Sequence, residues 1–188
     1  MSHTVFQKLD HALRAIDRPG SFCVDGSARA VLPGLEVAEL GSIGLPLSDT
    51  QANELKKQCE QAPYGKGEKT LIDTNVRRVW RMTSDRFTLT NPDWDTFLQK
   101  VVKKVQKELG LERQKLESHL YEMLLYEPDS FFLPHRDGEK LDRMVATLVI
   151  VLPSSFQGGE LVIRHEGEER IINFGGGDSP FRIHYAAF

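Results

Sequence analysis

Apolar residues recur at helical spacing in three stretches of the first 110 residues. The second stretch begins at Ser48, which stands three residues before Gln51 as in a capping box. The third begins at Asn91-Pro92, a favourable cap and first turn, and ends at Gly110. Its broad apolar stripe is typical of a helix that packs on a core. The pattern predicts helices over residues 4–16, 48–61 and 92–109.

After Leu116 the pattern becomes strand-like, with segments rich in Val, Ile, Leu, Phe and Tyr. Glu166-Gly167, between two of these segments, predicts a tight hairpin turn. Earlier in the chain, Leu71–Met82 predicts one or two short strands, and the Gly- and Pro-rich residues 20–47 predict loops and short edge strands. The late strands are expected over residues 118–126, 144–152, 159–165, 169–174 and 181–188.

Helices followed by antiparallel strands indicate an α+β fold. A length of 188 residues is that of one domain, and no linker-like stretch divides the chain. We therefore expect a single domain over residues 1–188. Residues 1–117 would form a helical support region, and residues 118–188 would form a strand-rich core.

Composition limits the cellular compartments and the classes of partner that we expect for this chain. The formal net charge of −3 gives no general case for nucleic acid or for an anionic membrane as partner. No run approaches the roughly 18 apolar residues of a membrane span, and no secretory signal precedes the first helix. Cys23 and Cys59 lie far apart and lack metal spacing. We expect a reduced, cytoplasmic protein, or a nuclear one if the source is eukaryotic, without membrane contacts.

The candidate chemistry lies at His135-Arg136-Asp137. If Phe131–Asp137 is extended, His135 and Asp137 point to the same side of the strand. Imidazole and carboxylate on one side are two of the three ligands of a non-haem iron site. Such a tripeptide also occurs by chance, and a hydrogen-bonded pair at a strand end is the alternative.

Three motifs before and after His135 and Asp137 stand in an order that suggests a family. Tyr126 precedes the pair, the apolar segment Ala146–Leu152 follows it, and Gly158-Gly159-Glu160 leads into the next predicted strand. This order resembles the double-stranded β-helix core of the Fe(II)/2-oxoglutarate-dependent dioxygenases, in their prolyl 4-hydroxylase-like branch. The resemblance covers residues 118–188. It implies a jelly-roll or cupin-like core with N-terminal support helices outside it.

The resemblance also implies a function. Fe(II) would be held by His135 and Asp137, and 2-oxoglutarate would be contacted by Tyr126 and Thr147, with ascorbate as an additional cofactor. Decarboxylation of 2-oxoglutarate to succinate would be coupled to hydroxylation of a protein side chain or a small molecule. No catalytic residue beyond the metal ligands is implied. A half-buried packing role is the alternative for Tyr126.

Two family features have no counterpart in this sequence: a distal His ligand, and the basic residue after it that pairs with 2-oxoglutarate. His184 is the remaining candidate for a third ligand, and Val151 stands where the family carries a Tyr that contacts 2-oxoglutarate. We expect that the chain is truncated before the distal ligand and is a poor catalyst as it stands. An incomplete sheet would expose an edge through which the chain could dimerise.

Two other functions are compatible with the sequence. One is an AlkB-like nucleic-acid demethylase on the same scaffold, against which the lack of a basic surface argues. The other is a non-catalytic jelly-roll domain that binds a partner. Arg77, Arg78 and Arg81 could contact an acidic or peptide substrate, but we favour a solvated basic strand.

Overall fold

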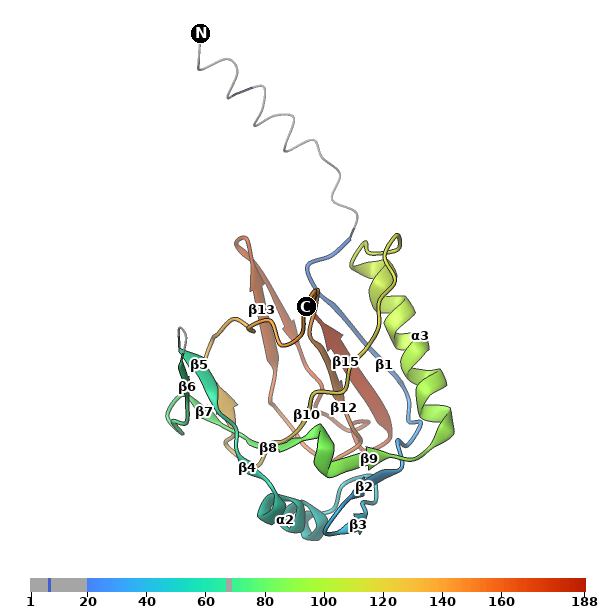
Figure 1. Ribbon diagram of the computed structural model, residues 1–188, viewed down its shortest axis with the longest axis vertical. Coiled ribbons are helices and arrows are strands. Elements are labelled where there is room, and N and C mark those ends of the chain that lie inside the picture. The colour runs from blue at the N-terminus through green and yellow to red at the C-terminus, as the bar shows by residue number, and fades with distance from the viewer. Residues whose placement is uncertain (1–6, 8–19, 67–68) are drawn as a thin grey trace.

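The computed structural model describes residue 7, residues 20–66 and residues 69–188. The helix predicted over residues 4–16 lies outside this part of the chain. Within it the fold is mixed α/β, with few helices and mostly antiparallel sheets (Figure 1). Neither of its longer helices has both the length and the apolar character needed to cross a membrane.

A three-stranded antiparallel sheet joins the two ends of the described chain. Its order is β1 (Val24–Arg29), β15 (Arg182–Ala187) and β12 (Leu148–Val151). Ala187 lies between its partners Val24 and Leu148 in the register. Since β1 comes from the region predicted as helical support, the early and late parts of the sequence share one sheet.

Helix α3 (Pro92–Glu108) covers one face of this sheet (Figure 1). Asn91 caps the helix by accepting a hydrogen bond from the backbone N–H of Asp93, as the sequence predicted. The apolar stripe faces the sheet and buries its side chains against it, which confirms the core role. The buried side chains of this cluster are Val24, Trp94, Phe97, Val101, Val105, Ile183, Tyr185 and Ala187.

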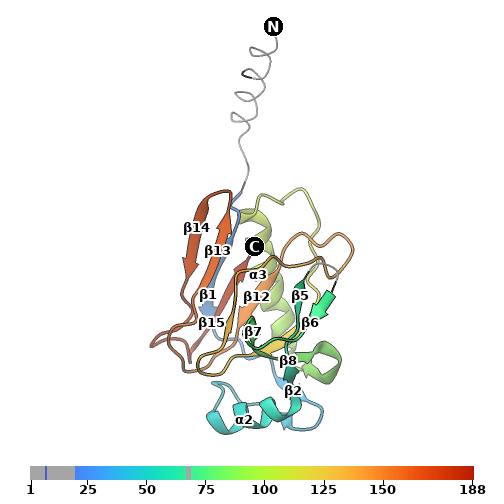
Figure 2. The same ribbon diagram turned by 90° about the vertical axis from the view of Figure 1, so that its left-hand side faces the viewer.

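A β-hairpin covers the opposite face of the sheet. It consists of β13 (Leu161–His165) and β14 (Glu168–Ile172), and Figure 2 shows it beside β1 and β15. The predicted turn at Glu166-Gly167 is confirmed, with positive φ angles of 47° and 87° that suit a tight hairpin. Ile172 and Phe174 pack against Ala186 of the sheet.

A second core lies at the end of the molecule where α2 (Asp49–Gln58) packs (Figure 1). Ser48 caps this helix by accepting from the backbone N–H of Gln51, and the helix ends three residues before the predicted Gln61. Around it lie β2 (Leu35–Val37), β3 (Gly41–Ser42), β4 (Glu60–Gln61), β8 (Trp80–Thr83), the 3₁₀ helix Ser84–Arg86, β9 (Phe87–Leu89) and β10 (Glu122–Leu125).

Two small strand pairs complete the described part. β5 (Tyr64–Lys66) pairs with β6 (Lys69–Leu71), and β7 (Arg77–Arg78) pairs with β11 (Phe131–Phe132). The five late strands are confirmed, each shorter than predicted. The expected helical support region before residue 118 also contains the strands β1 to β9. The predicted boundary therefore does not separate helices from strands.

Candidate functional site

The candidate site begins where β11 ends. Only Phe131 and Phe132 are in a strand, whereas the sequence predicted an extended segment as far as Asp137. The turn before β11 is fixed by Ser130, whose hydroxyl accepts from the backbone N–H of Glu127 at 2.9 Å. Pro134 then fixes its own φ and disfavours the helical region for Leu133, the residue before it.

His135 and Asp137 are nevertheless aimed at one point. Nε2 of His135 lies 3.4 Å from Oδ1 of Asp137, with 39% and 37% of the two side chains exposed. The pair is thus accessible from solvent but partly enclosed by protein. The expected convergence of the two side chains is present, although no regular strand produces it.

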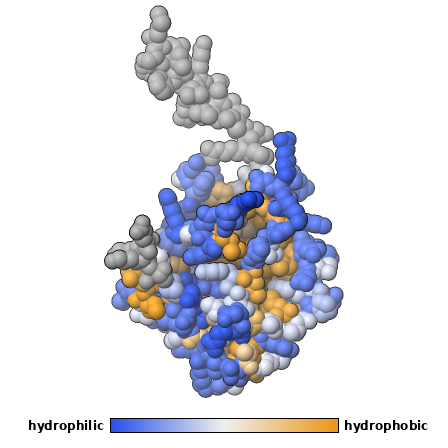
Figure 3. Space-filling view, viewed as in Figure 1, coloured by the Kyte–Doolittle hydropathy of each residue, from blue (hydrophilic) through white to orange (hydrophobic). Residues whose placement is uncertain are grey.

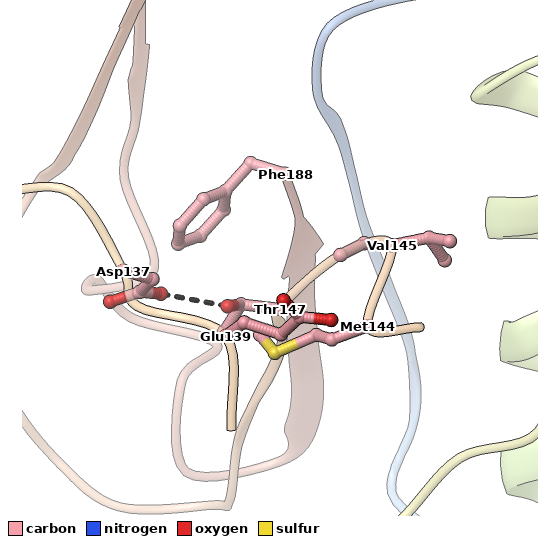
Figure 4. Close-up of a pocket in the computed structure, with 7 residues that line it drawn as sticks. Asp137, Glu139, Met144, Val145, Thr147 and Phe188 are labelled. Atoms are coloured by element: carbon pink, nitrogen blue, oxygen red, sulfur yellow. Dashed lines mark hydrogen bonds between the residues drawn. The ribbon is translucent and has the colours of Figure 1, made fainter. Parts of the chain in front are cut away.

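The other polar atom of each side chain has a protein partner. Nδ1 of His135 lies 2.9 Å from the carbonyl oxygen of Leu133. Because a carbonyl can only accept, Nδ1 carries the proton and the Nε2 lone pair is free in the neutral ring. Oδ2 of Asp137 accepts a 2.7 Å hydrogen bond from Oγ1 of Thr147 (Figure 4). Nε2 and Oδ1 therefore face each other, are free of any other hydrogen-bond partner, and are the two atoms of the pair that a cation could bind.

The electrostatics of the pair are reciprocal. The hydrogen bond to Asp137 raises the pKa of His135, while partial burial and the charge of Arg77 oppose that rise. The same bond lowers the pKa of Asp137, and the Thr147 hydroxyl lowers it further. A proton on Nε2 consequently bridges the pair at acidic pH. A metal ion would have to displace this proton to bind between the same atoms.

A hollow of about 300 Å³ adjoins Asp137. In Figure 4 the ring of Phe188 extends toward Asp137, and Thr147 lies on the other side of the hydrogen bond. The lining combines carboxylates with apolar groups, so it offers both a charged and an apolar surface next to the pair. The lining residues are Asp137, Glu139, Met144, Val145, Ala146, Thr147 and Phe188.

The segment that contains His135 and Asp137 also carries exposed apolar side chains. Figure 3 shows hydrophobic residues near the middle of the face seen in Figure 1, between hydrophilic ones. Several large apolar side chains between residues 120 and 145 have at least about a third of their surface exposed. They are Leu120, Tyr121, Leu124, Tyr126, Phe131, Leu133, Leu141 and Val145.

Tyr126 follows β10 and has 55% of its surface exposed. Partial burial raises the phenol pKa, the charge of Arg77 lowers it, and Glu122 and Asp137 raise it. Tyr126 does not line the hollow beside Asp137. Its hydroxyl lies in the field of both Arg77 and Asp137.

Arg77, Arg78 and Arg81 were expected to lie on a solvated basic strand, and the burial of Arg77 contradicts this expectation. The side chain of Arg77 is only 11% exposed, and its guanidinium donates a 2.7 Å hydrogen bond to the carbonyl of Pro63. Arg81 is also mostly enclosed and pairs with Glu60 at 2.6 Å. The sequence analysis missed Phe132, whose ring stacks on the imidazole of His135 at 3.5 Å between centroids. No sequence pattern marks this contact.

His184 does not complete a metal site. It lies on β15 opposite Val151, with its ring tilted against Phe174 and its Nε2 atom buried without a partner. Val151 packs with the cluster of Ile172 and Phe174. Across residues 20–66 and 69–188, no three His, Cys, Asp or Glu side chains converge to hold a metal ion.

Comparison with known proteins does not identify a function for this chain. No protein-family model, curated protein or solved structure matches this chain. The geometry around His135 and Asp137 is therefore the basis for a proposed function.

Proposed function

We propose that this chain has the fold and the metal site of an Fe(II)/2-oxoglutarate-dependent dioxygenase of the prolyl 4-hydroxylase-like branch. Its substrate class is a protein side chain or a small molecule. The single observation that carries the proposal is the His135–Asp137 pair, whose free Nε2 and Oδ1 atoms lie 3.4 Å apart.

The donor set is the first reason for the proposal. One imidazole nitrogen and one carboxylate oxygen are two ligands of the facial triad that non-haem iron prefers. The remaining atoms, Nδ1 of His135 and Oδ2 of Asp137, are occupied by Leu133 and Thr147. Such outer partners orient metal ligands and fix the imidazole tautomer.

The fold is the second reason. The sheet β1-β15-β12 faces the hairpin β13-β14 across an apolar layer that contains Ile172 and Ala186. Two facing antiparallel sheets are the basis of a jelly roll, and α3 lies on the outer face as a support helix. The double-stranded β-helix is accordingly part of the proposal.

The residues of this chain have distinct roles in the proposed site. His135 and Asp137 would hold the metal ion, Thr147 orients the carboxylate of Asp137, and Tyr126 would contact 2-oxoglutarate. When bound, Fe(II) with 2-oxoglutarate and O₂ supplies the oxidising chemistry, which yields succinate, CO₂ and a hydroxylated substrate. The hollow beside Asp137 provides room for a substrate group next to the metal ligands.

The proposed activity of the 188-residue chain is low. Two ligands hold a metal less tightly than three, and the described residues offer no third His, Cys, Asp or Glu at the pair. This observation also favours a second candidate function, a non-catalytic domain of the same fold that binds a partner.

Anaerobic binding of Fe(II) with 2-oxoglutarate tests the proposal. The complex is expected to show the weak visible charge-transfer absorption of this cofactor pair. The His135→Ala and Asp137→Ala variants should lose the absorption, and His119→Ala, an exposed histidine outside the site, should retain it. Succinate formation under air then measures activity.

Three outcomes separate the candidates. Absorption that depends on His135 and Asp137, with slow succinate formation, supports the proposal. Absorption without any turnover favours the non-catalytic domain. Absence of the absorption, or its persistence in both site variants, overturns the assignment of the pair as an iron site.

A further inference from the structure

We propose that Arg77 and Phe132 are positioning residues for His135, in a three-layer stack of guanidinium, phenyl ring and imidazole. This inference rests on the proposed function, because the ring that they hold is a proposed metal ligand. Neither residue belongs to the metal-ligand motif or touches the hollow beside Asp137.

The stack is defined by two measured contacts to one ring. The imidazole of His135 lies 3.5 Å from the Phe132 ring centroid at an interplanar angle of 18°. The guanidinium carbon of Arg77 lies 4.5 Å from the same centroid. Two groups cannot occupy one face of a phenyl ring at these distances, so the ring lies between them. Arg77 and Phe132 are brought together as directly opposed residues of β7 and β11.

The guanidinium of Arg77 is held in place by Pro63 and Glu122. It donates to the carbonyl of Pro63, its Nη2 lies 3.7 Å from Glu122, and its Nε is buried without a partner. Burying a guanidinium with an unpaired N–H group costs stability. The guanidinium lies over the electron-rich face of the Phe132 ring, where a cation is attracted to the ring.

The stack adds a restraint that the hydrogen bonds of His135 cannot supply. The bond from Nδ1 to Leu133 sets the tautomer, but it still permits rotation of the ring about that bond. Stacking on Phe132 fixes the plane of the ring, and therefore the direction of the Nε2 lone pair. For a side chain that is 39% exposed, this restraint keeps Nε2 aimed at the point shared with Asp137.

The neighbouring residues provide a matched control. Arg78 and Phe131 are the next opposed pair of the same two strands, and they face the other side. The guanidinium of Arg78 lies 5.9 Å from the Phe131 centroid and donates to the carbonyls of Pro128 and Asp129. This pair has the same chemistry, but it has no contact with His135.

The test compares Arg77→Gln and Phe132→Leu with Arg78→Gln and Phe131→Leu. Two properties are measured: Co²⁺ affinity by titration, and the tautomer and ring environment of His135 by ¹⁵N and ¹H NMR of the metal-free protein. Arg77→Gln and Phe132→Leu should weaken Co²⁺ binding about tenfold or more, as for outer partners of other metal ligands, and should give a mixed or shifted His135 signal. Phe132→Tyr should restore both properties, while the Arg78 and Phe131 variants should resemble the wild type.

Two results would overturn the positioning role. One is an unchanged His135 signal and Co²⁺ affinity in a folded Phe132→Leu protein, and the other is an equal loss in the Phe131→Leu control. If the wild type binds no Co²⁺, the proposed function fails and the NMR readout still decides the positioning role. Should Arg77→Gln fail to fold by circular dichroism, Arg77→Lys tests the same contact with the charge retained.

Discussion

The hydroxyl of Thr147 donates a 2.7 Å hydrogen bond to Oδ2 of Asp137. The bond links the segment that leads into β12 to the loop that carries the proposed metal ligands. It also leaves Oδ1 as the carboxylate oxygen that faces His135. Thr147, which the family resemblance suggested as a contact for 2-oxoglutarate, is thus a hydrogen-bond partner of Asp137, a proposed metal ligand.

Replacing Thr147 with Val tests this relationship. The variant keeps the shape of the side chain and loses the donor, so Asp137 is no longer held in one orientation. We expect Co²⁺ affinity, measured by titration, to fall about 10- to 100-fold. Thr147→Ser retains the hydroxyl and should bind within a few-fold of the wild type. Equal affinities of the Val variant and the wild type would show that the bond does not support the site.

The metal-free pair should give the protein a pH-dependent stability. The raised pKa of His135 stabilises the fold below its unfolded value of 6.5, and this contribution is lost as the pH rises through the folded pKa. The lowered pKa of Asp137 stabilises the fold above its unfolded value of 3.8, and this contribution is lost as the pH falls through the folded pKa. The pair therefore contributes most between these two values.

Urea unfolding of His135→Ala in the presence of a chelator measures this effect. The loss of unfolding free energy should be larger at about pH 5.5 than at about pH 8.5. Because both side chains are more than a third exposed, the difference should not exceed about 1 kcal/mol. A larger loss at the alkaline pH would contradict the direction of the His135 pKa shift.

Ile183 is fully buried between the central sheet and α3. Ile183→Ala should lower the free energy of unfolding by about 2–5 kcal/mol, because it removes buried surface and leaves a cavity. Ile183→Val should cost about 0.5–1.5 kcal/mol. Phe181, two residues away and 69% exposed, is the control, and its replacement with Ala should stay within about 0.5 kcal/mol. Similar losses at both positions would place the core elsewhere.

Asn91 makes two contacts that a mutational series can separate. It caps α3 by accepting from Asp93, and its Nδ2 donates a 2.7 Å hydrogen bond to the carbonyl of Leu32. Asn91→Ala removes both contacts and should cost about 1–3 kcal/mol in urea unfolding. Asn91→Asp keeps the cap and loses only the bond to Leu32, so it should cost less. Equal losses would assign no stability to the cap.

Helices and strands were predictable where local pattern was strong. The stripe and caps of α3 were predicted because side chains three and four residues apart share one face of a helix. The hairpin at Glu166-Gly167 was predicted because positive φ angles suit few residue types. The convergence of His135 and Asp137 was also suggested by spacing, although the supposed strand is absent.

The positions of Arg77, Thr147 and His184 could not be read from the chain. Arg77 appeared to be part of a solvated basic strand until the register of β7 with β11 placed it on Phe132. Thr147 reaches Asp137 through the approach of two segments, and His184 turns toward Phe174 inside a sheet sandwich. Arg77 and His184 are placed by strand register, and Thr147 by the approach of two loop segments, rather than by near neighbours in the chain.

The sequence by itself determined the helix stripes, the late strands, the hairpin turn and the proximity of one imidazole to one carboxylate. Only the tertiary structure decided which atoms of His135 and Asp137 remain free, and which side chains support them. The physical reason is the separation along the chain over which each kind of interaction acts. Periodicity and turn chemistry act between residues a few positions apart, whereas pairing and burial join segments that are distant in the chain.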